Sequence, residues 1–220
     1  DALRKQHAQL YAAMADASPG DPAMGMEGTS GQLGEQTALY LLLASDQAVN
    51  TVCETGFGAG HSTLTWLHGG THVEVHAFDL GELTGMGVGK TFVEAYYPGR
   101  LTLTVGDSSW TVPAYIDQHP DLRCDIVHID GGHFDITPWN DIVSMARASH
   151  AETLVLIDDM PSIGDVARAV RVAEEAGLLR EVACSNAVGY DENTKQRHLR
   201  GFCLAQFDPR AIEAVRALET

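Results

Sequence analysis

The stretch Thr51–Gly60, TVCETGFGAG, places a short apolar run directly before a turn with glycine at positions 56, 58 and 60. The run predicts a buried strand, and the glycines let a backbone approach a ligand that side chains would exclude. The turn departs from the dinucleotide pattern G-x-G-x-x-G, because His61 stands where the third glycine belongs. The stretch therefore predicts a parallel α/β sheet with a ligand at its carboxyl edge, although such a turn can also serve only to pack a helix on a strand.

Strand and helix signals alternate on both sides of this turn, which is typical of a parallel sheet covered by helices on both faces. We expect strands at 51–54, 72–78, 101–105, 124–129 and 153–157. Helices are expected at 61–67, up to 97 after the glycine-rich stretch 81–89, and at 111–118, 138–148 and 166–176. Two further strands, 181–185 and 201–207, are joined by a polar loop without a helix, so they can be antiparallel. The sequence thus predicts a seven-stranded, mostly parallel sheet.

The length and composition fit one domain. The chain has 220 residues, of which 45% are apolar, enough to fill a sizeable core. We divide it into an N-terminal helical cover (1–45), the α/β core (50–207) and a C-terminal helix (208–220). The cover comprises an amphipathic helix over 1–17, which does not resemble a signal peptide, and a second helix over 32–44. An apolar run of 18 residues is absent from the sequence, so no membrane span is expected.

The charge indicates the class of partner, and the cysteines indicate the cellular compartment. The formal net charge is −16, and the 14 Lys and Arg residues form no cluster along the sequence. Such a field repels a phosphate backbone, so we expect a small-molecule ligand and no nucleic acid. The four cysteines, Cys53, Cys124, Cys184 and Cys203, are widely spaced. Their spacing indicates buried free thiols in a reducing compartment, which predicts a cytoplasmic protein.

Carboxylates follow two of the apolar strands. Asp130 comes directly after the run ending at Ile129, and the pair Asp158 and Asp159 comes after the run ending at Ile157. Because the carboxyl ends of parallel strands share one edge of a sheet, these side chains should gather near the glycine turn. Hard oxygen ligands of this kind suit Mg²⁺, with Mn²⁺ or Ca²⁺ as alternatives. Alternatively, an aspartate after a strand can cap the next helix.

Taken in order, these motifs resemble the class I S-adenosylmethionine (SAM)-dependent methyltransferases over about residues 28–207. The turn E-T-G-F-G-A-G resembles their first motif, and Asp79 stands where they bind the ribose. The Gly106–Ser108 turn matches their adenine contact, and a late antiparallel strand pair is shared. The resemblance implies a Rossmann-like fold and the following cofactor-binding residues: Glu54, Gly56, Phe57, Gly58, Gly60, Ser62, Asp79, Gly106, Asp107, Ser108 and Asp130.

Within that family the acidic strand ends are similar to those of the metal-dependent O-methyltransferases, both catechol-type and antibiotic-tailoring. The resemblance implies that Asp130, Asp158 and Asp159 bind the metal, although catechol-type enzymes often have asparagine where Asp159 stands. His133, three residues after Asp130, occupies the position of their catalytic base. An imidazole can take a hydroxyl proton at neutral pH, although His133 could instead only orient a ligand. His128, inside a predicted strand, is expected to be a core histidine.

The expected function is therefore SAM-dependent, Mg²⁺-dependent methylation of a hydroxyl on a small molecule of phenolic or natural-product type. The rival interpretations are a metal-independent methyltransferase, an NAD-dependent oxidoreductase and a non-catalytic SAM-binding module. Family resemblance also implies a possible homodimer. Expected substrate contacts are Met24 and Met26 in the loop 18–31, Trp139, and the polar loop 188–198. The loop 18–31 can equally be a plain linker, and Trp139 a core residue.

Overall fold

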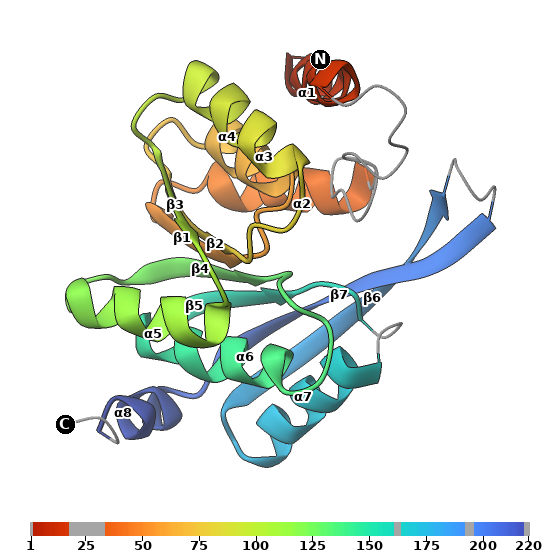
Figure 1. Ribbon diagram of the computed structural model, residues 1–220. Helices are drawn as coiled ribbons and strands as arrows, with labels where there is room; N and C mark the ends of the chain where they lie inside the picture. Colours follow the sequence, from red (N-terminus) through yellow and green to blue (C-terminus); the bar gives the residue numbers. More distant parts are fainter. Residues whose placement is uncertain (1, 18–33, 161–163, 192–195, 218–220) are drawn as a thin grey trace.

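The computed structural model describes residues 2–17, 34–160, 164–191 and 196–217. Seven strands form one sheet in the order β3-β2-β1-β4-β5-β7-β6. Strands β1 to β5 pair in parallel, and β7 runs antiparallel to both of its neighbours, β5 and β6. The mostly parallel sheet with a late antiparallel strand pair is confirmed, and it is the Rossmann-like arrangement (Figure 1).

The strands are β1 (Thr51–Thr55), β2 (Glu74–Asp79), β3 (Leu101–Val105), β4 (Cys124–Ile129), β5 (Ser149–Ile157), β6 (Leu179–Asp191) and β7 (Gln196–Phe207). The helices are α1 (Ala2–Ala17), α2 (Gly34–Ala44), α3 (His61–Gly69), α4 (Gly85–Tyr96), α5 (Ser108–Gln118), α6 (Thr137–Arg147), α7 (Gly164–Glu175) and α8 (Pro209–Ala217).

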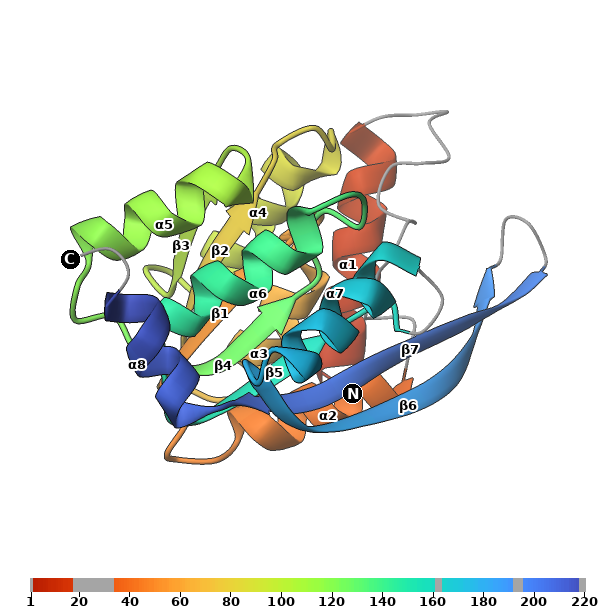
Figure 2. The same cartoon turned by 90° about the horizontal axis from the view of Figure 1, so that it is seen from below.

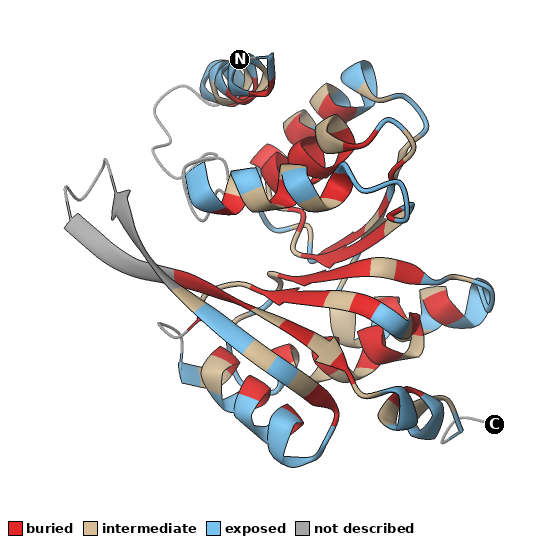
Figure 3. Ribbon diagram, turned by 180° about the vertical axis from the view of Figure 1, so that it is seen from behind, coloured by how far each residue is buried: buried red, intermediate tan, exposed pale blue. Residues whose placement is uncertain are grey.

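The helices cover the two faces of the sheet in two groups. Helices α1 to α4 lie over one face and α5 to α8 over the other (Figures 1 and 2). Successive residues of β1 enter opposite cores: Val52 packs with α1 to α4, and Cys53 with the helices of the other face. Figure 3 shows the buried residues concentrated in the sheet and on the helix surfaces that face it. No helix in the described ranges combines the length and apolar character that crossing a membrane requires.

Several bounds differ from those expected because apolar runs do not mark where pairing or capping occurs. Helix α5 begins at Ser108 rather than 111, because the Asp107 side chain accepts a hydrogen bond from Ser109 N (2.9 Å) and caps the helix. Strand β5 begins at Ser149 rather than 153, because the polar residues at its start gave no apolar signal in the sequence. The loop expected between the last two strands is largely a hairpin, paired as far as Asp191 with Gln196, because antiparallel backbone pairing needs no apolar side chains (Figure 2).

The cysteines correct one expectation: no free thiol is found, because all four form disulfides. Cys53 bonds to Cys124 within the sheet, and Cys184 bonds to Cys203, its direct partner across β6 and β7. Spacings of 71 and 19 residues along the chain gave no sign of these contacts, which the strand arrangement creates. The cysteine argument for a reducing compartment is therefore withdrawn, and with it that support for a cytoplasmic location.

Candidate active site

The carboxyl ends of β1, β4 and β5 stand side by side. The hydrogen bonding of the sheet continues one residue past each strand: Asp130 N donates to Thr55 O, and Asp158 N donates to Ile129 O, both at 2.9 Å. These bonds align the strand ends and bring the glycine turn, Asp130 and Asp158 to one edge. The expected gathering of these groups at the edge of the sheet is confirmed.

The glycine turn is shaped by close packing on one side and open space on the other. A Cβ on Gly56 would lie 1.8 Å from Asp130 O, so only glycine fits where β1 meets β4. Gly58 has a φ of +54°, and a Cβ there would meet only one atom within 4.0 Å, in the Leu83 side chain. Gly58 is therefore the point of the turn that a ligand can approach closely.

Asp79 ties the glycine turn to the end of β2. Its Oδ2 accepts a hydrogen bond from Gly58 N (2.7 Å), and its Oδ1 accepts one from Gly81 N (2.8 Å). Each carboxylate oxygen can accept a second bond, so the group retains capacity for ligand hydroxyls. Gly106 continues the same edge, since Gly106 N donates to Asp79 O at 2.8 Å. Asp107 is exposed there at the start of α5, followed by the partly buried Ser108.

Three of the expected cofactor residues are turned inward. Glu54 is fully buried, where its carboxylate accepts a hydrogen bond from Thr63 Oγ1 and lies 3.4 Å from His128 Nδ1. Phe57 is buried with its ring under Gly60, where an added Cβ would lie 2.7 Å from Phe57 Cζ. Ser62 is buried in the first turn of α3. The Glu54 carboxylate is thus engaged within the core.

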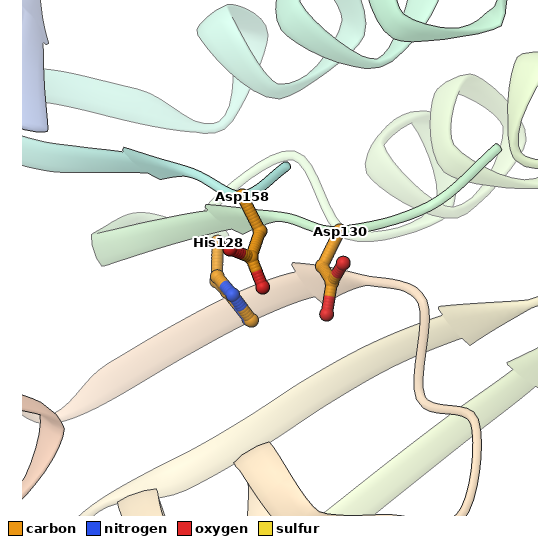
Figure 4. Close-up of side chains that lie close together, drawn as sticks. All are labelled: His128, Asp130 and Asp158. Carbon is orange, nitrogen blue, oxygen red and sulfur yellow. The ribbon is translucent and has the colours of Figure 1, made fainter. Parts of the chain in front are cut away.

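The acidic strand ends form a compact cluster with His133. Figure 4 shows Asp130, Asp158 and the ring of His128 turned to the same side of β4 and β5. His133 Nε2 lies 2.8 Å from Asp159 Oδ2 and 3.7 Å from Asp130 Oδ1. Two groups of three side chains place their possible ligand atoms within 4.8 Å of one another: His128, Asp130 and Asp158, and Asp130, His133 and Asp159.

The ionisation of the cluster reflects crowded negative charge. Burial and the neighbouring Asp158 raise the pKa of Asp130 to about 7, and burial also raises the pKa of Asp158. Hydrogen bonds with Asp130 and then Asp159 raise the pKa of His133 to about 10. As it stands, His133 is an imidazolium that offsets the two carboxylates and has no capacity to take a further proton at neutral pH.

The donor set fits a divalent cation held by oxygen. Both nitrogens of the fully buried His128 are engaged, with Nε2 at 2.8 Å from Tyr40 Oη and Nδ1 facing Glu54, so this ring is a core group, as expected. The carboxylates are held together against their mutual repulsion, which a 2+ ion would relieve. Asp159 adopts a φ of +60°, in the left-handed region that few residues other than glycine, asparagine and aspartate adopt.

Two features of the site escaped sequence analysis. Gln36 and Tyr40 reach it from α2, one helical turn apart, and both are buried. Asp141 of α6 is also buried, beside the hydroxyls of Ser108 and Thr55, and burial raises its pKa to about 6. Trp139 packs partly buried against the core. The loop with Met24 and Met26 lies outside the described residues, as do the side chains of residues 188–198.

Comparisons with known proteins agree with this geometry. Residues 53–160 match a family model described as a methyltransferase domain. This part of the chain, just under half of its length, is similar to a methyltransferase domain. The matched residues run from within β1 to just past β5 and so contain the glycine turn and all three strand-end aspartates. No curated protein matches the sequence.

The solved structures similar to this methyltransferase fold share little sequence with it. An O-methyltransferase from Bacillus cereus, solved with SAH, is 17% identical, with a TM-score of 0.67 over 94% of this chain and 91% of that one. The O-methyltransferase TomG from Streptomyces achromogenes, involved in tomaymycin synthesis and solved with SAM, is 17% identical, with a TM-score of 0.66 over 92% and 89%. An SAH-bound Podospora anserina methyltransferase is 14% identical, with a TM-score of 0.68 over 94% and 88%. At such identities the likeness establishes the fold.

Proposed function

We propose that this chain is a SAM-dependent O-methyltransferase that acts on a hydroxyl of a small phenolic or natural-product acceptor and requires a divalent cation, in the first place Mg²⁺. The observation that carries the proposal is the cluster of Asp130, Asp158, Asp159 and His133 at the same edge as the open glycine turn. The SAM and SAH of the solved neighbours support the choice of cofactor.

On this proposal the cofactor lies along the glycine turn. Gly58 offers its backbone without a side chain in the way, and Asp79 holds the ribose hydroxyls with its remaining acceptor capacity. The Gly106–Ser108 turn borders the adenine. Glu54 contributes indirectly, because its buried carboxylate fixes the strand end that leads into the turn.

The acceptor lies over the acidic cluster. A divalent cation there would lower the pKa of the acceptor hydroxyl and help to align it. Asp130, Asp158 and Asp159 would hold that charge, which would release His133 from the two carboxylates that keep its pKa high. His133 can then receive the hydroxyl proton, and the fixed strand ends keep acceptor and methyl donor at reacting distance.

A metal-independent methyltransferase is the second candidate. It is favoured by one observation: His133 and Asp159 already form a close ion pair, so part of the negative charge of the cluster is offset without a metal. In that case the acidic strand ends hold the loop after β4 in place, and the acceptor atom is not restricted to oxygen.

A calorimetric titration separates these candidates. SAM is titrated into chelator-treated protein, and a small catechol is then titrated into the SAM complex with and without Mg²⁺. Binding of SAM together with Mg²⁺-dependent catechol binding would support the proposal, and His133→Ala should then lower the methylation rate by about 10²–10⁴. SAM binding with no effect of Mg²⁺ on any acceptor tested would favour the second candidate. Absence of SAM binding would overturn both.

A further inference from the structure

A continuous chain of buried polar groups runs beneath the acidic cluster. It crosses from α3 through β1 and β4 to the N-terminal helix α2, and its members are Thr63, Glu54, His128, Tyr40 and Gln36. Each of these side chains is at most 1% exposed. Its last member, Gln36, returns to the site because it interacts with the Asp158 carboxylate and so lowers the pKa of Asp158, against the larger effect of burial, which raises it. The chain therefore connects a helix outside the matched domain to a predicted metal ligand.

Helix α2 is fixed closely enough to hold such a contact in place. A Cβ on Gly69 would lie 2.7 Å from Ala44 Cβ, so the end of α3 accepts α2 only because glycine stands there. Tyr40 also stacks on Trp66 of α3, with ring centroids 4.1 Å apart and planes inclined by 16°. Gln36 lies one turn before Tyr40, and its Nε2 donates to Tyr40 Oη at 2.7 Å. Contacts with Tyr40 and with Asp158 thus orient the Gln36 side chain.

The polarity of the Gln36 amide follows from its partners. An ionised carboxylate only accepts hydrogen bonds, so it is the amide N–H that faces Asp158. The carbonyl oxygen Oε1 is fully enclosed and has no hydrogen-bond partner among the residues that the structure describes. An unsatisfied buried acceptor is destabilising, so Gln36 is a poor choice for stability alone.

We propose that Gln36 is a positioning residue of the metal site, which holds the Asp158 carboxylate in the orientation that binds the cation. The inference rests on the metal-dependent function proposed above. It extends the site from the matched methyltransferase domain to helix α2, which would then contribute to metal affinity without contacting the ion.

Gln36→Met tests the proposal, because methionine keeps the length and apolar contacts of the side chain and removes both amide groups. Mg²⁺ binding is measured by calorimetry on the full chain, and Mn²⁺ binding by electron paramagnetic resonance. We expect both affinities to fall by about 10- to 100-fold, the usual effect of losing a group that orients a ligand. SAM affinity without metal, and the unfolding temperature of the metal-free protein, should not fall.

Gln6→Met is the matched control. Gln6 on α1 accepts a hydrogen bond from Tyr97 Oη at 3.0 Å, so the change removes an equivalent glutamine–tyrosine bond away from the cluster. Metal affinity should match that of the unchanged protein. If Gln36→Met binds Mg²⁺ as tightly as the unchanged protein, or only lowers the unfolding temperature, the positioning role is overturned while the proposed function stands. If the unchanged protein binds neither cation, the metal site itself is wrong and this inference fails with it.

Discussion

At the scale of single residues, the cluster of Asp130 and His133 makes stability depend on pH. The pKa of Asp130 is about 7 in the folded protein and 3.8 in an unfolded chain, so the folded state binds this proton more tightly. The pKa of His133 is likewise raised, from 6.5 to about 10. Both groups therefore make the metal-free protein less stable as pH rises, Asp130 between about pH 4 and 7 and His133 between about pH 6.5 and 10.

The same shifts predict how Mg²⁺ should stabilise the protein. The cation needs ionised carboxylates, so the rise in unfolding temperature at a fixed Mg²⁺ concentration should be small at pH 5.5 and larger at pH 8. Asp130→Asn should abolish this rise and reduce the loss of metal-free stability between pH 5 and 8. Thermal unfolding at several pH values, with Mg²⁺ or chelator, measures both effects. An equal Mg²⁺ effect at pH 5.5 and 8 would contradict this prediction.

Residue identity alone indicated some of these groups and not others. Asp130 and Asp158 were predictable because each follows a clear apolar run, and parallel strands end at one edge. Gln36 could have been noticed as a polar residue on the stripe Gln36, Tyr40 and Ala44, which is the buried face of α2. Its contact with Asp158 could not, because it depends on how α2 is set against the sheet.

At the scale of elements, Gly201 of β7 controls the turn that carries Asp158 and Asp159. Met160 N donates to Gly201 O at 2.8 Å, which anchors the turn to the neighbouring strand. A Cβ on Gly201 would lie 2.2 Å from Met160 O and 2.2 Å from Ser185 O, both backbone atoms. Any side chain there must push the turn or β6 away.

Gly201→Ala should therefore lower both the unfolding temperature and the Mg²⁺ affinity, because the displaced backbone includes the residue next to Asp159. Gly87→Ala is the control: Gly87 lies inside α4 with nothing within 4 Å of an added Cβ, so the change should raise stability by about 0.5–1 kcal/mol. Thermal unfolding and Mg²⁺ calorimetry measure the two effects. An alanine at 201 that is tolerated at full metal affinity would show that the turn is not held by β7.

Helices and strands, like single residues, were predictable where local sequence determines them and unpredictable where packing between distant segments does. Strands β3 and β4 have the bounds that their apolar runs predict. Helix α4 begins at Gly85, earlier than expected, since the glycines that suggested a loop are tolerated within it. Gly89 lies there so close to Ala59 O, 2.1 Å from an added Cβ, that packing against the glycine turn requires it. Local propensity could not show this contact between distant segments.

At the scale of the whole molecule, the net charge bears on what the chain can bind, and the helix packing bears on how the molecule is assembled. A charge of −16 disfavours nucleic acid and favours cations, which suits a site of three carboxylates. The homodimer implied by family resemblance stays a prediction. The two faces of the sheet are closed by separate groups of helices, and the disulfides join strands within the sheet rather than these layers.

The disulfides yield the last prediction, which concerns global stability. The Cys53–Cys124 bond closes a segment of 71 residues, and constraining a long segment of unfolded chain typically stabilises a protein by about 2–4 kcal/mol. Reduction should therefore lower the denaturant midpoint, and the variant Cys53→Ala/Cys124→Ala should show most of that loss without reductant. Unfolded, unreduced protein should not react with iodoacetamide. The variant Cys184→Ala/Cys203→Ala is the control, since its bond closes only 19 residues and should contribute less. Alkylation of all four cysteines in unreduced protein would show that the chain keeps free thiols, and would restore the argument for a reducing compartment.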